Sequence, residues 1–496
     1  MKILLLSMPD IAPLLMHESA VHMAHLGIAS IGANLDPGHE IFLADLVRKR
    51  RSVKKYLSNL VRKLEPDLIG LAAMTWQFDT CVKIAHLLKE VRPQAKIVLG
   101  GYHATLMYKE IATSPDARWF DFIVRGEGEE TVRRLVRALE GQDNVQRIPG
   151  LSYKINGLFS HNKKAENLDL STLKPPIRDK RRLTWGYHIM TNKVEVLETS
   201  RGCTRSCNFC CMRYMYGRSF RTYPISRVIE DLDIIYHQCN TRWVFLSDDN
   251  IVLNVKRVME LCDAIIARQY KDLVLVVQAD CLSMAANEAM VAKMAEAGFG
   301  VVFLGIENGS KKNLSQAGKG DIVAASKKAI EHCQKYGMMV MAGLIFGFPD
   351  DDAQSIKENY EFFQELGADS PYCQLLTPYP KTGMREQLIE AGLVSNLYNY
   401  KTYNGLWANV RTRHLSAEEL QYQFWYQREV VLGWWNPPEI IRKQGRAWTF
   451  IWRFLAKPII KRRYDKQLRT VGWQGLFAEA EAHWEAINYF PDLEGY

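Results

Sequence analysis

The run Thr199-Ser-Arg-Gly-Cys-Thr-Arg-Ser-Cys-Asn-Phe-Cys210 sets three cysteines at C-x3-C-x2-C spacing, directly after the apolar stretch Val194–Leu197. We call Cys203–Cys210 the cysteine motif. A cubane iron-sulfur cluster has four iron corners, so three thiolates leave one iron without a protein ligand. Cys203, Cys207 and Cys210 are therefore predicted to hold such a cluster, with one corner open to another molecule.

Two other uses of cysteine fit this sequence less well. A structural zinc site has four closed ligands, usually in two short pairs. A secreted disulfide framework would be denser than ten cysteines in 496 residues, and the apolar run in Met1–Pro9 is too short for an export signal and predicts a buried strand. The cysteines outside the motif supply no second pair at metal spacing: Cys81, Cys211, Cys239, Cys262, Cys281, Cys333 and Cys373. Cys211, which abuts the motif, is predicted not to be a ligand.

Length and charge limit the class of protein further. A chain of 496 residues is long enough for about two or three domains, and it holds no run of about 18 uncharged apolar residues that would span a membrane. The net charge of +9 arises in residues 442–469, which hold ten Lys or Arg and one acid, Asp465. Because the rest of the chain is balanced, we do not expect a nucleic-acid-binding surface.

From residue 1 to 145, short apolar runs alternate with amphipathic stretches such as Thr80–Val91, which predicts an α/β fold with a doubly wound parallel sheet. The predicted strands are Ile3–Leu6, Ile41–Ala44, Leu68–Met74, Ile97–Leu99 and Phe122–Val124. Two glycine-bearing segments follow these strands, and we call them the first glycine turn (Gly100–Thr105) and the second glycine turn (Arg125–Thr131). Glycine lets a backbone approach a ligand closely, and such sheets bind ligands at the carboxyl ends of their strands.

Residues 146–190 are polar and proline-rich, and predict a linker with one small hairpin. From 191 to 384, strands again alternate with helices such as Ile225–His237 and Ile322–Tyr336, which predicts a partial (β/α)6 barrel of the TIM type with its site at the carboxyl ends of the strands. The predicted strands are Val194–Leu197, Val244–Leu246, Leu273–Val277, Val301–Leu304, Val340–Phe346 and Tyr372–Leu376. Residues 385–496 are predicted to be a helical, aromatic C-terminal region.

The cysteine motif at the start of this barrel resembles that of the radical SAM enzymes. In that family S-adenosylmethionine fills the open iron corner, and its reductive cleavage gives a 5'-deoxyadenosyl radical that removes hydrogen from unactivated carbon. The resemblance implies that residues after the barrel strands contact S-adenosylmethionine, with Phe209 near the adenine. The other candidates are Asp248, Asp249, Gln278, Asp280, Glu307, Ser310 and Gly347. Each could instead begin a loop or cap the next helix.

The region 1–145 resembles the cobalamin-binding, Rossmann-like domain that precedes the barrel in one large subgroup of radical SAM enzymes. The resemblance implies contacts with cobalamin from Thr75, Gly100, Gly101, Gly126, Glu127 and Gly128. The region 1–145 lacks the D-x-H-x-x-G motif whose histidine ligates cobalt from below in cobalamin mutases. His17, His22 and His25 are predicted to be structural or to contact solvent. The alternative is a degenerate domain in which the glycines serve only as turns.

The basic segment 442–469 interleaves Lys and Arg with aromatic residues such as Trp448 and Trp452. This pattern suits a helix at a membrane surface, where basic groups meet anionic headgroups. A solvated face over a buried aromatic stripe is the more frequent outcome. We therefore expect a cytoplasmic protein, with peripheral contact to the inner face of the membrane through 442–469 as the alternative.

Over nearly its whole length the chain is similar to the subgroup that contains the anaerobic magnesium-protoporphyrin monomethyl ester cyclase and hopanoid-biosynthesis enzymes. The resemblance implies a large apolar substrate, lipid-like or tetrapyrrole, and a reductant such as flavodoxin or ferredoxin. C-methylation through methylcobalamin is preferred, and a cyclase without methyl transfer is the alternative. A methylthiotransferase would need a further N-terminal cysteine trio, and a non-catalytic iron-sulfur protein would not need the S-adenosylmethionine segments.

Overall fold

The computed structural model of the chain describes residues 1–11, 21–189, 192–432 and 457–496. The chain forms two compact units, each assembled from more than one stretch. Unit 1 comprises Met1–Cys203, Cys211–Phe245 and Ile487–Tyr496, and unit 2 comprises Thr204–Cys210 and Leu246–Ala486. The contiguous domains with boundaries at 145, 190 and 384 stay a prediction.

Unit 1 contains a seven-stranded sheet with the order β3-β1-β4-β5-β6-β7-β8. Its strands are β1 (Lys2–Ser7), β3 (Glu40–Asp45), β4 (Leu68–Ala72), β5 (Lys96–Gly100), β6 (Phe122–Val124), β7 (Leu151–Ile155) and β8 (Leu158–His161). The strands from β3 to β6 run parallel, which confirms the doubly wound sheet. The hairpin predicted inside the linker is β7–β8, and it extends this sheet by antiparallel pairing to β6.

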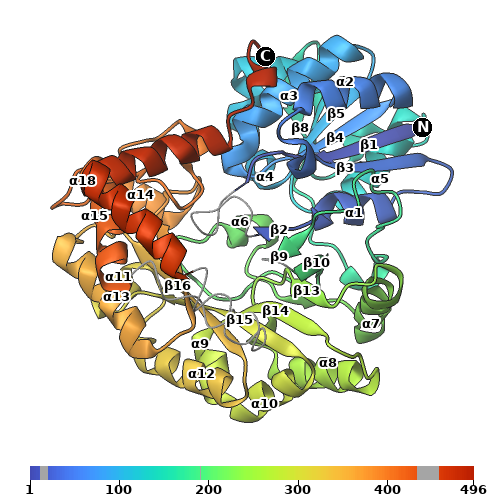
Figure 1. The fold of residues 1–496 in the computed structure, drawn as a ribbon. Coiled ribbons are helices and arrows are strands. Elements are labelled where there is room, and N and C mark those ends of the chain that lie inside the picture. Colours follow the sequence, from blue (N-terminus) through green and yellow to red (C-terminus); the bar gives the residue numbers. More distant parts are fainter. Residues whose placement is uncertain (12–20, 190–191, 433–456) are drawn as a thin grey trace. The chain divides into compact units, whose positions relative to one another are not determined.

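Helices cover both faces of the parallel strands (Figure 1). One face carries α2 (Val53–Leu64) and α3 (Phe78–Val91), and the other carries α1 (Leu26–Ala33) and α5 (Gly128–Leu139), while α4 (Tyr102–Thr113) follows β5. Strands buried on both faces are apolar along their whole length, which is why their positions could be predicted. Their side chains pack with those of α1 and α5 in a core that includes Ile3, Leu5, Ile28, Leu68, Val98, Val132 and Leu135.

The strand order fixes where this sheet opens to a ligand. Numbered along the chain, the parallel strands lie in the order second, first, third, fourth, fifth, as in flavodoxin-like sheets. Ligands of such sheets bind outside the carboxyl ends of the strands, at the point where the order reverses. That point lies between β1 and β4, so the segments Met8–Ile11 and Ala73–Thr75 flank it.

The rest of unit 1 surrounds the start of the cysteine motif. Strand β11 (Ser200–Arg201) pairs with β12 (Arg221–Thr222), and α6 (Met212–Tyr216) follows the motif. The predicted helix Ile225–His237 is α7 (Ile225–Asp233) followed by a π-helical turn at Ile234–Gln238. The remaining strands of this part are β2 (Val21–His22), β9 (His188–Ile189), β10 (Asn192–Leu197) and β13 (Trp243–Leu246).

Unit 2 contains four neighbouring parallel strands: β14 (Val274–Ala279), β15 (Phe299–Glu307), β16 (Met339–Phe346) and β17 (Ser370–Leu375). Its helices here are α8 (Val255–Ala267), α9 (Cys281–Ala286), α10 (Glu288–Glu296), α11 (Lys311–Gln316), α12 (Val323–Lys335) and α13 (Ala353–Leu366). Helices α10, α12 and α13 form an outer layer (Figure 1). With β10 and β13, strands occupy all six predicted positions, and the partial (β/α)6 barrel is confirmed.

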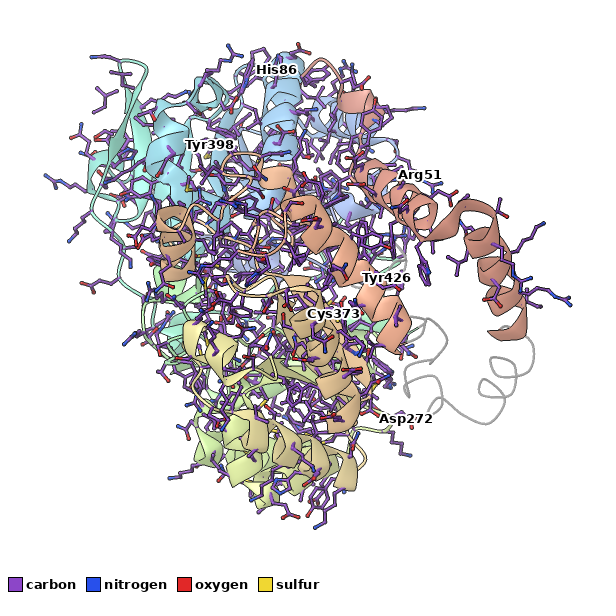
Figure 2. The ribbon with its side chains drawn as sticks, turned by 90° about the vertical axis from the view of Figure 1, so that its left-hand side faces the viewer. Arg51, His86, Asp272, Cys373, Tyr398 and Tyr426 are labelled. Atoms are coloured by element: carbon purple, nitrogen blue, oxygen red, sulfur yellow. The ribbon has the colours of Figure 1, made fainter. Side chains whose placement is uncertain are left out.

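The C-terminal region is helical, as predicted, with α14 (Gly383–Glu390), α15 (Ala417–Leu432) and α18 (Lys457–Ile487). Tyr426, which Figure 2 labels on α15, meets Trp473 of α18 with ring centroids 5.6 Å apart. Residues 442–456 of the basic segment lie outside the described residues. In the part of the chain that is described, no helix combines the length and apolar character needed to cross a membrane.

Residues Ile487–Tyr496 pack within unit 1. The Asn488 side chain bonds both the backbone N–H and the carbonyl oxygen of Ile11, at 3.0 and 2.8 Å. His86 of α3, labelled in Figure 2, stacks on Trp119 at 3.9 Å and meets the Tyr496 ring at 5.2 Å. The end of the described chain thereby fastens the segment that leaves β1.

Gly101 and Gly38 offer a matched test of how tightly the first glycine turn is packed. Both have φ of +95°, but a Cβ at Gly101 would lie 2.6 Å from the Ala73 carbonyl oxygen, whereas a Cβ at Gly38 would meet no described atom within 4 Å. Alanine strains either backbone, because residues other than glycine rarely adopt a φ near +95°. We expect Gly101→Ala to lower the free energy of unfolding in urea by a further 1 to 3 kcal/mol, about the usual effect of overpacking. Equal losses in the two variants would contradict this packing.

Candidate functional site

The ligand-facing edge of the unit 1 sheet carries the predicted glycines, which divide into two kinds. A Cβ at Gly100 would meet only the Leu71 carbonyl oxygen, at 4.0 Å, and a Cβ at Gly126 would meet no atom of the described residues within 4 Å. At Gly128 a Cβ would approach the Ile31 side chain to 2.9 Å, and Gly101 is similarly enclosed. Gly100 and Gly126 thus leave open space at this edge, whereas Gly101 and Gly128 are needed for packing.

Thr75 and Asp10 lie at the point where the strand order reverses. Thr75 is buried at the start of a 3-10 turn, Thr75–Gln77. Asp10 was not among the predicted residues, yet it is 6% exposed and accepts a 2.7 Å hydrogen bond from Thr80 Oγ1. Its Oδ2 atom has no hydrogen-bond partner among the described residues, and burial raises the pKa of Asp10 to about 7. The signal that could have identified Asp10 is its position directly after the first strand.

The Glu127 carboxylate is engaged within the protein. It accepts hydrogen bonds from Arg201 at 2.8 Å, from Arg221 at 2.9 Å and from the Leu168 N–H at 2.9 Å. A contact of Glu127 with cobalamin stays a prediction. Because the carboxylate is already engaged, the backbone of Glu127 is better placed than its side chain to make that contact.

Arg201 is the centre of this buried network. Besides Glu127, its guanidinium donates to Glu129 at 2.7 Å and to Glu198 at 2.8 Å, and Arg201 is 6% exposed. Burial alone would raise the pKa of Glu129, but Arg201 and the Ser30 hydroxyl lower it below its ordinary value. One buried cation is therefore shared by three carboxylates, and its charge with the added hydrogen bonds offsets the burial of Glu129.

Two of the three histidines near the first loop lie in the described residues, and both have the structural roles that were predicted for them. His25 Nδ1 accepts the Ile28 N–H at 3.3 Å and caps α1, and burial lowers the pKa of His25. His22 Nδ1 lies 3.1 Å from Arg48 Nη1. His17 lies outside the described residues.

Cys203, Cys207, Cys210 and Phe209 are all half-buried, so the motif is partly open to its surroundings. Three thiolates suit an iron-sulfur cluster with one open corner, and the Cys210 N–H donates to the Cys207 carbonyl oxygen at 3.2 Å in a tight turn. Nowhere in the described ranges do three His, Cys, Asp or Glu side chains already converge as metal ligands, so the ligand roles stay a prediction.

Asn208 fastens the second half of the motif to unit 2. Its N–H donates to the Ala317 carbonyl oxygen at 2.8 Å, and its own carbonyl oxygen accepts the Met384 N–H at 3.1 Å. A Cβ at Gly318 would lie 2.9 Å from the Ser206 carbonyl oxygen, so the segment after α11 approaches the motif closely. Backbone contacts therefore help to set the path of this loop.

Lys319 is a second residue that sequence reasoning missed. Its ammonium lies 2.6 Å from Glu307 Oε1 and donates to the Gly305 carbonyl oxygen at 2.9 Å. Burial would lower the pKa of Lys319, but attraction to Glu307 and Cys207 raises it above the ordinary lysine value. A cation beside a cysteine favours the thiolate, the form that ligates metal. Its place between Gly318 and Gly320, in the loop that follows α11, was the available signal.

Glu307 and Gly347 follow neighbouring strands and have unusual backbones. Glu307 has φ of +66°, at an irregularity in the pairing of β15 with β16. A non-glycine residue with such a φ is strained and is often found at functional sites. The Gly347 N–H donates to Asp351 at 2.9 Å, and Gly347 has φ of +90°. A ligand contact of Gly347 would therefore use other backbone atoms.

Two candidates have the capping role that their residue types also permit. Asp280 caps α9 by accepting the Ser283 N–H at 2.9 Å, and it pairs with Arg205 at 2.8 Å. Burial would raise the pKa of Asp280, but hydrogen bonds from Asn250 and Ser283 lower it. Ser310 caps α11 through the Asn313 N–H at 3.4 Å. Their contacts with S-adenosylmethionine stay predictions.

The remaining candidates follow β13 and end β14. Asp248 is fully buried, and its carbonyl oxygen accepts a hydrogen bond from Gln278 Nε2 at 3.4 Å. Asp249 is half-buried. Gln278 is thus held against the Asp248 backbone, as expected of polar groups gathered at the carboxyl ends of barrel strands.

Comparisons with known proteins agree with this architecture. The family model of the B12 binding domain matches residues 13–136, and that of the radical SAM superfamily matches residues 197–363. The uncharacterized methyltransferase PH0819 of Pyrococcus horikoshii is 27% identical over 419 residues, which cover 84% of this chain and 89% of that protein. The anaerobic magnesium-protoporphyrin IX monomethyl ester cyclase of Rubrivivax gelatinosus is 25% identical over 406 residues, which cover 77% of this chain and 70% of the cyclase.

A solved structure shares the fold over nearly the whole chain. The cobalamin-dependent S-adenosylmethionine radical enzyme OxsB, with aqua-cobalamin and S-adenosylmethionine bound, superposes with a TM-score of 0.71 at 17% identity, over 95% of this chain and 71% of OxsB.

The raised pKa of Asp10 predicts a pH dependence of stability. Between its ordinary pKa of 3.8 and about 7 the folded chain holds a proton that the unfolded chain has lost. Stability therefore falls as the pH rises through this range and levels off above about 7. Asp10→Asn is neutral throughout, so its stability relative to the wild type should rise between pH 5 and pH 8 by about 3 kcal/mol, since only about two pKa units of the shift lie in this window. Urea unfolding at both pH values measures this gain, and a difference that does not change with pH would contradict it.

Proposed function

The chain belongs to the radical SAM enzymes that carry a B12-binding domain, and from that premise we propose that it methylates an unactivated carbon of a large apolar molecule, lipid-like or tetrapyrrole. The observation that carries the proposal is the pairing of a three-cysteine motif beside Lys319 in one part of the chain with an open glycine edge in another. When bound, the cluster would supply the electron that cleaves S-adenosylmethionine, and cobalamin would supply the methyl group.

The chain's own residues would bind and orient these groups. Cys203, Cys207 and Cys210 would be the cluster ligands, and Lys319 would place a positive charge near Cys207. Gly100 and Gly126 would let the backbone approach cobalamin, since space lies open beside both.

S-adenosylmethionine would lie along the carboxyl ends of the barrel strands. The polar groups there come from successive strand ends: Asp248, Asp249, Gln278, Asp280, Glu307, Ser310 and Gly347. Gln278 is held by the Asp248 carbonyl oxygen, and Asp280 accepts a hydrogen bond from Asn250, so both are placed before a ligand arrives, which lowers the entropy lost on binding.

A cyclase reaction without methyl transfer is the second candidate, and the similarity to the Rubrivivax gelatinosus cyclase supports it. That similarity also supports a tetrapyrrole as the substrate class, whereas the similarity to PH0819 supports methyl transfer. Peripheral contact of residues 442–469 with a membrane surface stays a prediction. A one-electron reductant is required by either reaction.

The two reactions differ in their products. We expect the anaerobically reconstituted chain, given S-adenosylmethionine, hydroxocobalamin and dithionite, to form both 5'-deoxyadenosine and S-adenosylhomocysteine, which liquid chromatography with mass spectrometry measures. Formation of 5'-deoxyadenosine alone would favour the cyclase. Alanine at Cys203, Cys207 or Cys210 should abolish the cluster absorbance and the formation of 5'-deoxyadenosine, whereas Cys211→Ala should retain both. A cluster that persists in any of the first three variants would contradict the assignment of that cysteine as a ligand.

A graded series at Gly100 tests the cobalamin edge. Because a Cβ there meets only a carbonyl oxygen at 4.0 Å, Gly100→Ala should fold and bind hydroxocobalamin as the wild type does. The larger side chain of Gly100→Leu should fill the open space and lower the affinity at least about tenfold, the effect of about 1.4 kcal/mol. Absorbance titration measures both affinities, with circular dichroism as the control for folding. Unchanged binding in Gly100→Leu would contradict the assignment.

A further inference from the structure

The two flanks of the cysteine motif both contact the glycine turns of the unit 1 sheet. On the first flank, Arg201 lies two residues before Cys203 and donates to Glu127 and Glu129 of the second glycine turn, at 2.8 and 2.7 Å. On the other flank, Met212 lies two residues after Cys210, and its sulfur accepts a hydrogen bond from the Tyr102 hydroxyl of the first glycine turn at 3.0 Å. All of these flanking contacts lie within unit 1.

The first of these contacts is the stiffer one. The side chains of Arg201, Glu127 and Glu129 are 7%, 4% and 5% exposed. An arginine presents its N–H groups in a rigid planar fork, so the three carboxylates that it binds are held at fixed relative positions. Glu198, the third of them, precedes Arg201 by three residues and ties the guanidinium to the segment between β10 and β11. A displacement of the second glycine turn must therefore move the segment that enters the cysteine motif, or leave a buried charge without its partner.

The same turn lies at the edge where cobalamin would bind. Gly126, the residue before Glu127, faces open space, and its N–H donates to Thr105 of the first glycine turn at 2.9 Å. The two turns are thus linked to each other as well as to the two flanks. A ligand that orders the turns orders the flanks in the same step.

We propose that Arg201 is a positioning residue that couples cobalamin binding to cluster binding, so that each cofactor raises the affinity of the chain for the other. This inference rests on the proposed function. Coupling between two sites is reciprocal in binding free energy, and its usual size corresponds to about 5- to 150-fold in affinity. The inference concerns binding and is independent of which reaction follows.

The test compares the affinity of the full chain for hydroxocobalamin in two states, with the cluster reconstituted and without it. The ratio of the two dissociation constants, from anaerobic absorbance titration, measures the coupling. We expect a wild-type ratio of at least about fivefold in favour of the cluster-loaded chain. In Arg201→Lys, which keeps the charge but not the fork, we expect a ratio near one.

Arg178 supplies the matched control. It is buried in the same unit, with a side chain 5% exposed, and it pairs instead with Glu195 and Asp231. Arg178→Lys should lower stability as Arg201→Lys does, yet retain the wild-type ratio. If Arg201→Lys does not fold, Glu129→Gln removes one charge of the network while keeping the shape of the side chain, and it should reduce the ratio.

The outcomes separate this inference from the function on which it rests. A wild-type ratio of one, or an unchanged ratio in Arg201→Lys or Glu129→Gln, would overturn the coupling while both cofactors still bind. An equal fall of the ratio in Arg178→Lys would also overturn it, because the effect would then follow from general destabilisation. A wild-type chain that binds neither cofactor would overturn the proposed function and the coupling together.

Discussion

The Arg201 guanidinium is shared by Glu127 and Glu129, which follow β6, and by Glu198, which follows β10. A carboxylate taken out of water is unfavourable unless a cation and hydrogen bonds replace its hydration. Because one cation serves all three, and Arg221 shares Glu127, none of these groups can be displaced alone. The course of the chain into the cysteine motif is thereby tied to the course of the second glycine turn.

The strands could be predicted because burial on both faces makes each of them a continuous apolar run. Ile3–Leu6 and Ile97–Leu99 lie within β1 and β5, and each of these two strands extends beyond the prediction by one residue at each end, whereas β4 ends two residues before the predicted Met74. The role of the hairpin β7–β8 could not be read in the same way. Its strands were recognisable locally, but its pairing with β6 joins segments about 30 residues apart, which no local pattern specifies.

The residue types of the site could be predicted, but the residues with which each of them forms ion pairs and hydrogen bonds could not. Arg201 stands in the quoted motif, yet its partner Glu127 lies 74 residues away in sequence. Asp280 and Ser310 show the converse limit, because an acid or serine after a strand looks the same in sequence whether it caps a helix or meets a ligand. Glu307 is distinguished only by its φ of +66° and by Lys319, both of which are properties of the folded chain.

Unit 1 is completed by residues that are synthesised after all of unit 2. Asn488 holds the backbone of Ile11, and the Asp492 carboxylate accepts the Lys54 N–H at 2.7 Å, near the start of α2. On the ribosome, the sheet of β1 and β4 emerges early, but these contacts must wait until more than 400 further residues have been translated. Domains that lie in one stretch fold in order as they emerge. This unit instead reaches its final form only after the barrel has been made, so its ligand-facing edge is finished late in biosynthesis.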